Sequence, residues 1–219
     1  RDVEPCGRAI MIDRYLYPVL GRGLRPVAAH LVRLGVTADQ ITVAGFLAGL
    51  TALPLLWVNA FGLALLAILL NRLADGLDGA VARATQPTDR GAFLDIALDF
   101  FFYATIPLGF ALADPGHNAL PAAMLITAFV GTGSSFLAFA VMAGKRGLEP
   151  DAYPSKGLFY LGGLTEGVET VAMFCLMCLF PQAFPTLALI FAAACLLTTV
   201  TRWLAGWRLF AGGGPTDGA

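Results

Sequence analysis

Charged side chains are scarce in this chain. Of its 219 residues, 14 are Lys or Arg and 15 are Asp or Glu, a charged share of 13%. Soluble domains carry about 25% charged residues. Because 58% of the residues are hydrophobic, too few polar side chains remain to cover a water-exposed surface. The composition excludes a soluble globular protein and a disordered one, and we expect an integral membrane protein.

Other chemistries are also missing from the sequence. The net charge is −1, and no block of basic and aromatic residues occurs, so we expect no nucleic acid partner. Cys175 and Cys178 form a C-x-x-C pair, but no second pair or nearby histidine follows to complete a metal site. We interpret these thiols as small apolar side chains.

Long apolar stretches make up most of the chain. Six of them approach the ~20 residues that a helix needs to cross a bilayer, and runs of this length without strict alternation favour helices. The sequence predicts an all-α integral membrane protein with six transmembrane helices, preceded by an N-terminal amphipathic surface helix. Pro54 and Pro107 are expected to kink their helices. The expected spans are 38–58, 61–82, 92–112, 119–143, 157–180 and 184–206.

The basic residues predict how these spans are oriented. With the N-terminus inside the cell, all 14 Lys and Arg residues fall on the cytoplasmic side, and the outer connections hold none. We therefore expect a multi-pass protein of the inner membrane with both termini in the cytoplasm. The expected regions are a juxtamembrane amphipathic segment (1–35), a six-helix transmembrane domain (36–210) and a disordered tail (211–219).

Four aspartates lie where the second span ends and the third begins. A charge inside a bilayer costs roughly 2.5–3.5 kcal/mol on insertion scales, so such acids need a reason. Asp75 and Asp78 are three residues apart, and Asp95 and Asp99 are four apart, so each pair shares one helix face. A short inner loop joins the two helices, which must be antiparallel neighbours. We expect all four carboxylates to converge near the cytoplasmic boundary.

Converging carboxylates repel one another unless a cation lies between them. Magnesium prefers oxygen ligands, and two metal ions bridged by carboxylates can hold a pyrophosphate during phosphoryl transfer. Gly79 and Gly91 leave room for a ligand, and Arg83 can contact a phosphate. The alternative is that the acids are ordinary helix-end residues, solvated or paired with Arg72, Arg83 and Arg90.

Eight positions of this region resemble the signature of the CDP-alcohol phosphatidyltransferases, and the resemblance covers about residues 10–210. The spacer between Arg83 and Gly91 has seven residues here, where the family usually has eight, a difference that bears on the placement of Arg90. The matching pattern is Asp75-x2-Asp78-Gly79-x2-Ala82-Arg83-x7-Gly91-x3-Asp95-x3-Asp99.

The resemblance implies an activity and a role for each matching residue. The activity is transfer of a phosphatidyl-type group from CDP-diacylglycerol to a small alcohol, with release of CMP, in phospholipid biosynthesis. It implies two Mg²⁺ or Mn²⁺ ions, membrane lipids as surroundings and a homodimer. Asp99 is the expected general base. The implied metal ligands are Asp75, Asp78, Asp95 and Asp99, and the implied CDP-binding residues are Asp75, Gly79, Ala82 and Arg83.

The acceptor site is less defined by the sequence. Glu166 and Glu169 share a face of the fifth span, where they either bind a polyol or hold helices together through interhelical hydrogen bonds or Arg202. Asp39 stands where relatives often have Asn, unless it only caps a helix. Family acceptors are often phosphorylated and then need cations, although lone basic residues also serve as topology anchors. The candidates for acceptor binding are Arg90, Lys145, Lys156, Glu166, Glu169 and Arg202.

Two other functions remain open at this stage. A small transporter or ion-binding membrane protein would use its intramembrane acids to line a pathway, but such acids should be spread through the depth of the membrane. Here the four aspartates crowd one boundary. An inactive family member would be expected to lose some of the motif, yet all four aspartates and Arg83 are present.

Overall fold

The structure is a computed structural model that describes residues 12–147, 165 and 167–211. All regular secondary structure within these ranges is helical. Lys156, Glu166 and the expected tail beyond residue 211 lie outside the described residues. The helices are α1 (Ile12–Arg33), α2 (Ala38–Leu50), α3 (Ala52–Trp57), α4 (Phe61–Ala84), α5 (Asp89–Ala113), α6 (Pro115–Lys145), α7 (Gly167–Leu179), the short 3-10 helix η3 (Pro181–Ala183) and α8 (Phe184–Leu209).

The expected first span consists of two helices. Thr37 begins α2 with a capping box, in which its hydroxyl accepts from the backbone N–H of Gln40 and the Gln40 side chain accepts from the N–H of Thr37. The helix ends at Leu50 because Pro54 has no N–H to donate to the Leu50 carbonyl oxygen. Where the sequence predicts a kink at Pro54, the structure has a break between α2 and α3 at Thr51. At Pro107, by contrast, α5 continues as one helix.

Four helical stretches of the described chain are long and apolar enough to cross a membrane, which confirms an all-α protein with several apolar membrane-capable helices. They are Ala38–Trp57, Asp89–Ala113, Pro115–Lys145 and Pro181–Leu209. Helix α4 is continuous over 24 residues, but it carries Arg72, Asp75, Asp78 and Arg83, so it is not among these four stretches. Helix α7 covers only the second half of the expected span 157–180, whose first half lies outside the described residues. The count of six spans stays a prediction.

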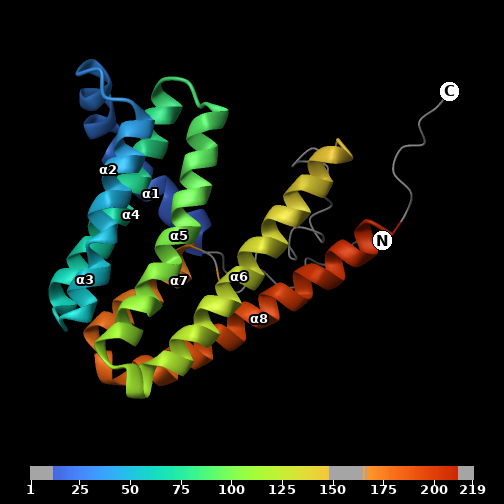
Figure 1. Ribbon diagram of the computed structural model, residues 1–219. Coiled ribbons are helices and arrows are strands. Elements are labelled where there is room, and N and C mark those ends of the chain that lie inside the picture. Colours follow the sequence, from blue (N-terminus) through green and yellow to red (C-terminus); the bar gives the residue numbers. More distant parts are fainter. Residues whose placement is uncertain (1–11, 148–164, 166, 212–219) are drawn as a thin grey trace.

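The helices form two connected groups. Helices α2, α4 and α5 stand side by side, and the long pair α6 and α8 extends away from them (Figure 1). Helix α1 packs on the end of α4, where Ala28 meets Ala80 and Val81 in a small apolar cluster. That α1 lies on the membrane surface stays a prediction.

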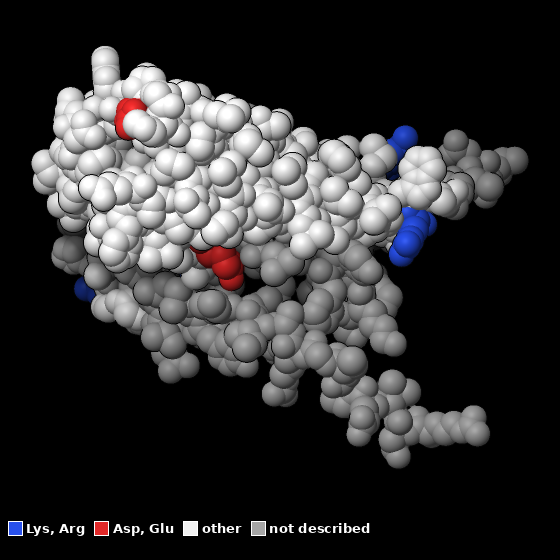
Figure 2. All heavy atoms as spheres, turned by 90° about the horizontal axis from the view of Figure 1, so that it is seen from below, with Lys and Arg blue, Asp and Glu red and all other residues white. Residues whose placement is uncertain are grey.

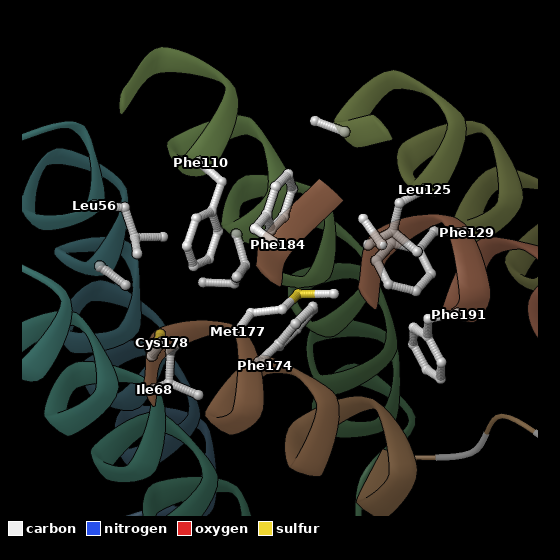
Figure 3. Close-up of a cluster of buried hydrophobic side chains, with 14 of the residues drawn as sticks. Leu56, Ile68, Phe110, Leu125, Phe129, Phe174, Met177, Cys178, Phe184 and Phe191 are labelled. Carbon is white, nitrogen blue, oxygen red and sulfur yellow. The ribbon is translucent and has the colours of Figure 1, made fainter. Parts of the chain in front are cut away.

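Aromatic side chains fill the centre of the bundle. Phe110 of α5 stacks on Phe184 at the start of α8, with ring centroids 4.3 Å apart, and Leu56 and Met177 surround them (Figure 3). Farther along, Phe129 and Phe191 meet edge to face at 6.0 Å. Large apolar side chains also cover the outside, and the face seen in Figure 2 is almost wholly uncharged in its described part. An exterior of this kind suits lipid contact.

Two glycines set how closely the helices approach. A Cβ on Gly109 of α5 would lie 2.8 Å from the Leu56 side chain, and a Cβ on Gly49 of α2 would lie 2.7 Å from Asn71 Cβ of α4. Neither position has room for a side chain, so the helices pack at glycine, as small residues permit in membranes.

We predict that Gly109→Ala destabilises the protein. The new methyl group must displace fully buried Leu56, and overpacking of this kind costs about 1–3 kcal/mol. Gly62→Ala is the matched control, because it lies in a helix with nothing within 4 Å of the added Cβ, and alanine there favours the helix. Thermal unfolding in detergent should show a lower midpoint for Gly109→Ala alone. Equal midpoints for the two variants would contradict the close packing.

Candidate active site

Helices α4 and α5 bring the predicted aspartates together. One carboxylate oxygen each from Asp75, Asp95 and Asp99 can be chosen so that all three lie within 4.8 Å of one another, and all three residues are half-buried. Asp78 is buried on the same side of α4 and accepts a 2.5 Å hydrogen bond from the Thr42 hydroxyl of α2. The convergence expected from the spacing is therefore observed for Asp75, Asp95 and Asp99, and Asp78 lines the same small space.

The guanidinium of Arg72 lies against these carboxylates. Its Nη2 donates to Asp99 Oδ1 at 2.5 Å, and its Nη1 donates to Asp99 Oδ2 at 3.1 Å. The same Nη1 is 3.7 Å from Asp75 Oδ2. From the sequence, Arg72 is only a possible partner of helix-end acids. The signal available was its position one helical turn before Asp75.

A second set of contacts fixes Arg72. Its Nε and Nη2 donate to Asn71 Oδ1 at 2.9 and 2.6 Å, and Nη1 donates to the Tyr103 hydroxyl at 3.2 Å. The guanidinium carbon also lies 5.3 Å from the ring centroids of Phe102 and Tyr103, within cation–π range. With its side chain 14% exposed, Arg72 is a largely buried charge, and each of its five N–H groups donates a hydrogen bond.

A cavity of about 490 Å³ opens beside the aspartates. Its walls come from the end of α1, the start of α2, the end of α4 and the start of α5, together with the loop between the last two. This volume lies in the range of roughly 300–1,000 Å³ that is typical of small-molecule sites. The motif residues that line it are Asp78, Gly79, Ala82, Gly91 and Asp95.

Glycine at position 79 keeps this wall open. A Cβ there would lie 3.1 Å from Arg83 Nη1, so the guanidinium of Arg83 rests over the glycine beside the cavity. Asp78 and Asp95 line both this cavity and the small space between the aspartates. A ligand in the larger cavity can therefore reach the carboxylates directly.

An ion pair bridges the wall of the cavity. Asp39 at the start of α2 accepts from Arg90 Nε at 2.7 Å and from Nη2 at 2.5 Å. A Cβ on Gly91 would lie 3.1 Å from Asp39 Oδ1, so this glycine lets α5 approach α2. Thr37 is the N-cap of α2. Asp39 is therefore not the helix cap. It links α2 to the first turn of α5, directly after the loop that is one residue shorter than is usual in the family.

The acceptor candidates are dispersed. Of those described, Arg90 lines the larger cavity, while Lys145, Glu169 and Arg202 line neither cavity. Arg202 is buried in α8, where Nη1 donates to the Thr132 carbonyl at 3.0 Å and the guanidinium lies over Phe136. Lys145 is exposed at the end of α6, and basic side chains gather at that end of the α6–α8 pair (Figure 2).

The aspartate cluster is suited to a hard divalent cation. Its ligands are all carboxylate oxygens, which Mg²⁺ and Mn²⁺ prefer, and the close approach of Asp75, Asp95 and Asp99 places one oxygen of each within reach of a single ion. The donor set does not suit zinc or copper, which favour nitrogen and sulfur ligands.

Comparison with known proteins gives relatives along most of the chain. The inner membrane protein YnjF of Escherichia coli K12 is 51% identical over 197 residues, which is 90% of this chain and 96% of that protein. A phosphatidylinositol phosphate synthase of Streptomyces avermitilis is 37% identical over 131 residues, 58% of this chain and 53% of that protein.

A solved structure shares the fold. The crystal structure of Mycobacterium tuberculosis phosphatidylinositol phosphate synthase with CDP-DAG bound superimposes with a TM-score of 0.64 at 24% identity, covering 85% of this chain and 94% of that one. The same enzyme in complex with manganese and citrate gives a TM-score of 0.63.

The sequence profile of one family, described as CDP-alcohol phosphatidyltransferase, matches residues 35–212. The match includes the aspartate cluster and the parts of the cavity wall that come from α2, α4 and α5. The chain belongs to the CDP-alcohol phosphatidyltransferase family.

Proposed function

We propose that this protein transfers a phosphatidyl-type group from CDP-diacylglycerol to a small alcohol, with release of CMP, as a step of phospholipid biosynthesis. The observation that supports this most directly is the cavity of about 490 Å³ that opens onto the aspartates. The crystallised relative bound CDP-DAG, and a second relative is named a phosphatidylinositol phosphate synthase. A CDP-linked lipid is therefore the donor that we propose.

The CDP moiety is assigned to the larger cavity. Gly79 has no side chain and Ala82 only a methyl group there, which lets a nucleotide approach the backbone of α4 closely. Arg83 is placed beside Gly79 to donate to a phosphate oxygen. Asp75 completes this set from the adjoining space between the aspartates.

The metal is assigned to Asp75, Asp78, Asp95 and Asp99. We propose two Mg²⁺ or Mn²⁺ ions, since four carboxylates carry enough charge for both and the crystallised relative bound manganese. A divalent ion bound here would supply positive charge to the pyrophosphate of the donor. Thr42 orients Asp78, and Arg72 orients Asp99, so the carboxylates are held toward one another.

Asp99 is our proposed general base. An alcohol is a weak nucleophile, and a carboxylate within hydrogen-bond reach can accept its proton as the oxygen attacks phosphorus. A new bond then forms between the acceptor oxygen and the phosphorus that carries diacylglycerol. The bond from that phosphorus to the oxygen of CMP breaks, and the proton passes from Asp99 to solvent.

The acceptor is proposed to be a phosphorylated polyol. Two relatives support this class: the synthase from Streptomyces avermitilis and an archaetidylinositol phosphate synthase of Pyrococcus horikoshii, 35% identical over 96 residues. Arg90 is the strongest binding candidate, because it lines the cavity and its side chain is 79% exposed. The weaker candidates are Lys145, Lys156, Glu166, Glu169 and Arg202.

We also propose how the protein lies in the membrane. Its apolar helices and its relative named an inner membrane protein support a multi-pass inner membrane protein. The positive-inside pattern supports six spans over 36–210 with both termini and the active site at the cytoplasmic face. The juxtamembrane role of 1–35, the disordered tail and the homodimer stay predictions.

The first test is CMP release by the purified protein. With CDP-diacylglycerol and Mg²⁺ or Mn²⁺, we expect CMP to appear with at least one acceptor, and phosphorylated polyols should react best. EDTA should stop release, because the carboxylates then lack their metal. The panel should pair inositol phosphate with inositol and glycerol phosphate with glycerol, and also include serine. No CMP release with any acceptor of the panel, in a folded sample, would argue against the proposed transferase activity.

The second test is Asp99→Asn. The amide keeps the shape of the side chain but cannot accept the proton, so turnover should fall by about 10²–10⁴-fold. Binding of CDP-diacylglycerol, measured by titration, should remain. Asp114→Asn is the control, because Asp114 caps α6 at an exposed turn away from both cavities and asparagine caps equally well. Near-normal turnover in Asp99→Asn would remove Asp99 as the base.

A further inference from the structure

Arg72 uses its entire hydrogen-bonding capacity inside the aspartate cluster. A guanidinium has five N–H donors, and the five hydrogen bonds of Arg72 go to both oxygens of Asp99, twice to Asn71 Oδ1, and to the Tyr103 hydroxyl. The side chain is held by three different residues. A salt bridge formed only for stability does not require this degree of fixation.

The contact chain continues to a third helix. The Asn71 amide nitrogen donates to the Gly45 carbonyl of α2 at 3.0 Å, which turns Asn71 Oδ1 toward Arg72. Gly49 makes the space for Asn71, because a Cβ at 49 would lie within 3 Å of three of its side-chain atoms. The packing of α2 on α4 therefore sets the orientation of the Asn71 side chain. Asn71 in turn orients the Arg72 guanidinium, which orients the Asp99 carboxylate.

Charge gives Arg72 a second effect. Among the described residues that line the space between the aspartates, Arg72 is the cation and the four aspartates are the anions. Its positive charge offsets their mutual repulsion in the absence of metal. The same charge opposes a divalent ion at the same carboxylates, because like charges at such distances repel strongly in a half-buried site.

The Asp99 carboxylate can still bind a metal. Each carboxylate oxygen has two lone pairs. The two hydrogen bonds from Arg72 Nη1 and Nη2 use one lone pair on each oxygen of Asp99. The other lone pairs remain for a cation shared with Asp75 and Asp95. Arg72 can thus orient Asp99 both before and after metal binding.

We infer that Arg72 is the positioning residue of Asp99 and the internal counter-cation of the aspartate cluster, an inference that rests on the proposed function of that cluster as a metal site. Before metal binds, the positive charge of Arg72 offsets the repulsion between the aspartates and keeps them close together. The same charge weakens the binding of a metal ion. Arg72 lies outside the motif pattern. Its role depends on its contacts with Asp99, Asn71 and Tyr103.

The test compares metal binding in Arg72→Gln, Arg72→Lys and the wild-type protein. Mn²⁺ alone is the probe, followed by electron paramagnetic resonance of the free ion. Arg72→Gln should bind Mn²⁺ roughly tenfold more tightly, because the opposing charge is gone. Arg72→Lys keeps the charge and should bind like the wild type. Arg146→Gln is the matched control, since Arg146 is also a stacked arginine that donates to the carbonyls of Leu209 and Phe210, and it lines neither cavity.

Stability without metal gives a second readout. In EDTA, Arg72→Gln should unfold at a lower temperature than the wild type, and added Mn²⁺ should raise its midpoint by more. The double variant Arg72→Gln with Asp99→Asn should regain part of the stability lost in EDTA, because it removes the unpaired charge as well. This comparison stays informative if Arg72→Gln alone does not fold.

Turnover separates geometry from charge. Both Arg72→Gln and Arg72→Lys should lose roughly 10- to 100-fold in kcat, because a lysine ammonium cannot hold both oxygens of Asp99 and Asn71 together. Full activity in Arg72→Lys would overturn the positioning role. Mn²⁺ binding in Arg72→Gln no tighter than in the wild type, or shifted equally by Arg146→Gln, would overturn the counter-cation role.

The proposed function can fail independently. If the wild-type protein neither binds Mn²⁺ nor releases CMP, the metal site itself is wrong. If the wild type does both while the variants behave like the control, only the inference about Arg72 is wrong.

Discussion

Repulsion between the carboxylates of α4 and α5 is the constraint on which the site depends. Three half-buried aspartates place oxygens within 4.8 Å of one another, where the dielectric is lower than in water and unbalanced charge is costly. The protein meets this constraint with a fixed arginine, a hydroxyl from Thr42 on Asp78 and a set of oxygen ligands suited to divalent metal. Each of these parts comes from a different turn or helix.

The helices can hold this arrangement because they approach closely. Gly45 of α2 packs against Ala74 of α4, and Gly49 against Asn71. In a bilayer, packing of this kind replaces the hydrophobic effect as the force between helices. The same contact that joins α2 to α4 also aims Asn71 at Arg72. The same contacts therefore pack the helices together and orient the side chains of the site. In a membrane protein with few polar residues, a residue such as Asn71 serves both purposes.

The sequence predicted the helical elements well where the signal was local. Long apolar runs marked α4, α5, α6 and α8 near their observed positions. The first expected span matches the apolar stretch Ala38–Trp57. The break at Thr51 is sharper than the kink that Pro54 predicted, because α2 ends at Leu50 and α3 begins at Ala52. Spacings of three and four residues predicted that the aspartates share helix faces and converge, which the geometry confirms for Asp75, Asp95 and Asp99. Their chemical roles stay proposals.

The sequence by itself determined the membrane class, the helical composition and the motif that identifies the family, because composition, run length and short spacings are properties of neighbouring residues. Only the tertiary structure decided that Arg72 donates hydrogen bonds to Asp99 and that Asp39 pairs with Arg90. It also decided that a cavity opens between α1, α2, α4 and α5. The physical reason is that these contacts join residues 27 to 51 positions apart or walls from separate helices. They depend on the rotation and separation of whole helices, which no local pattern records.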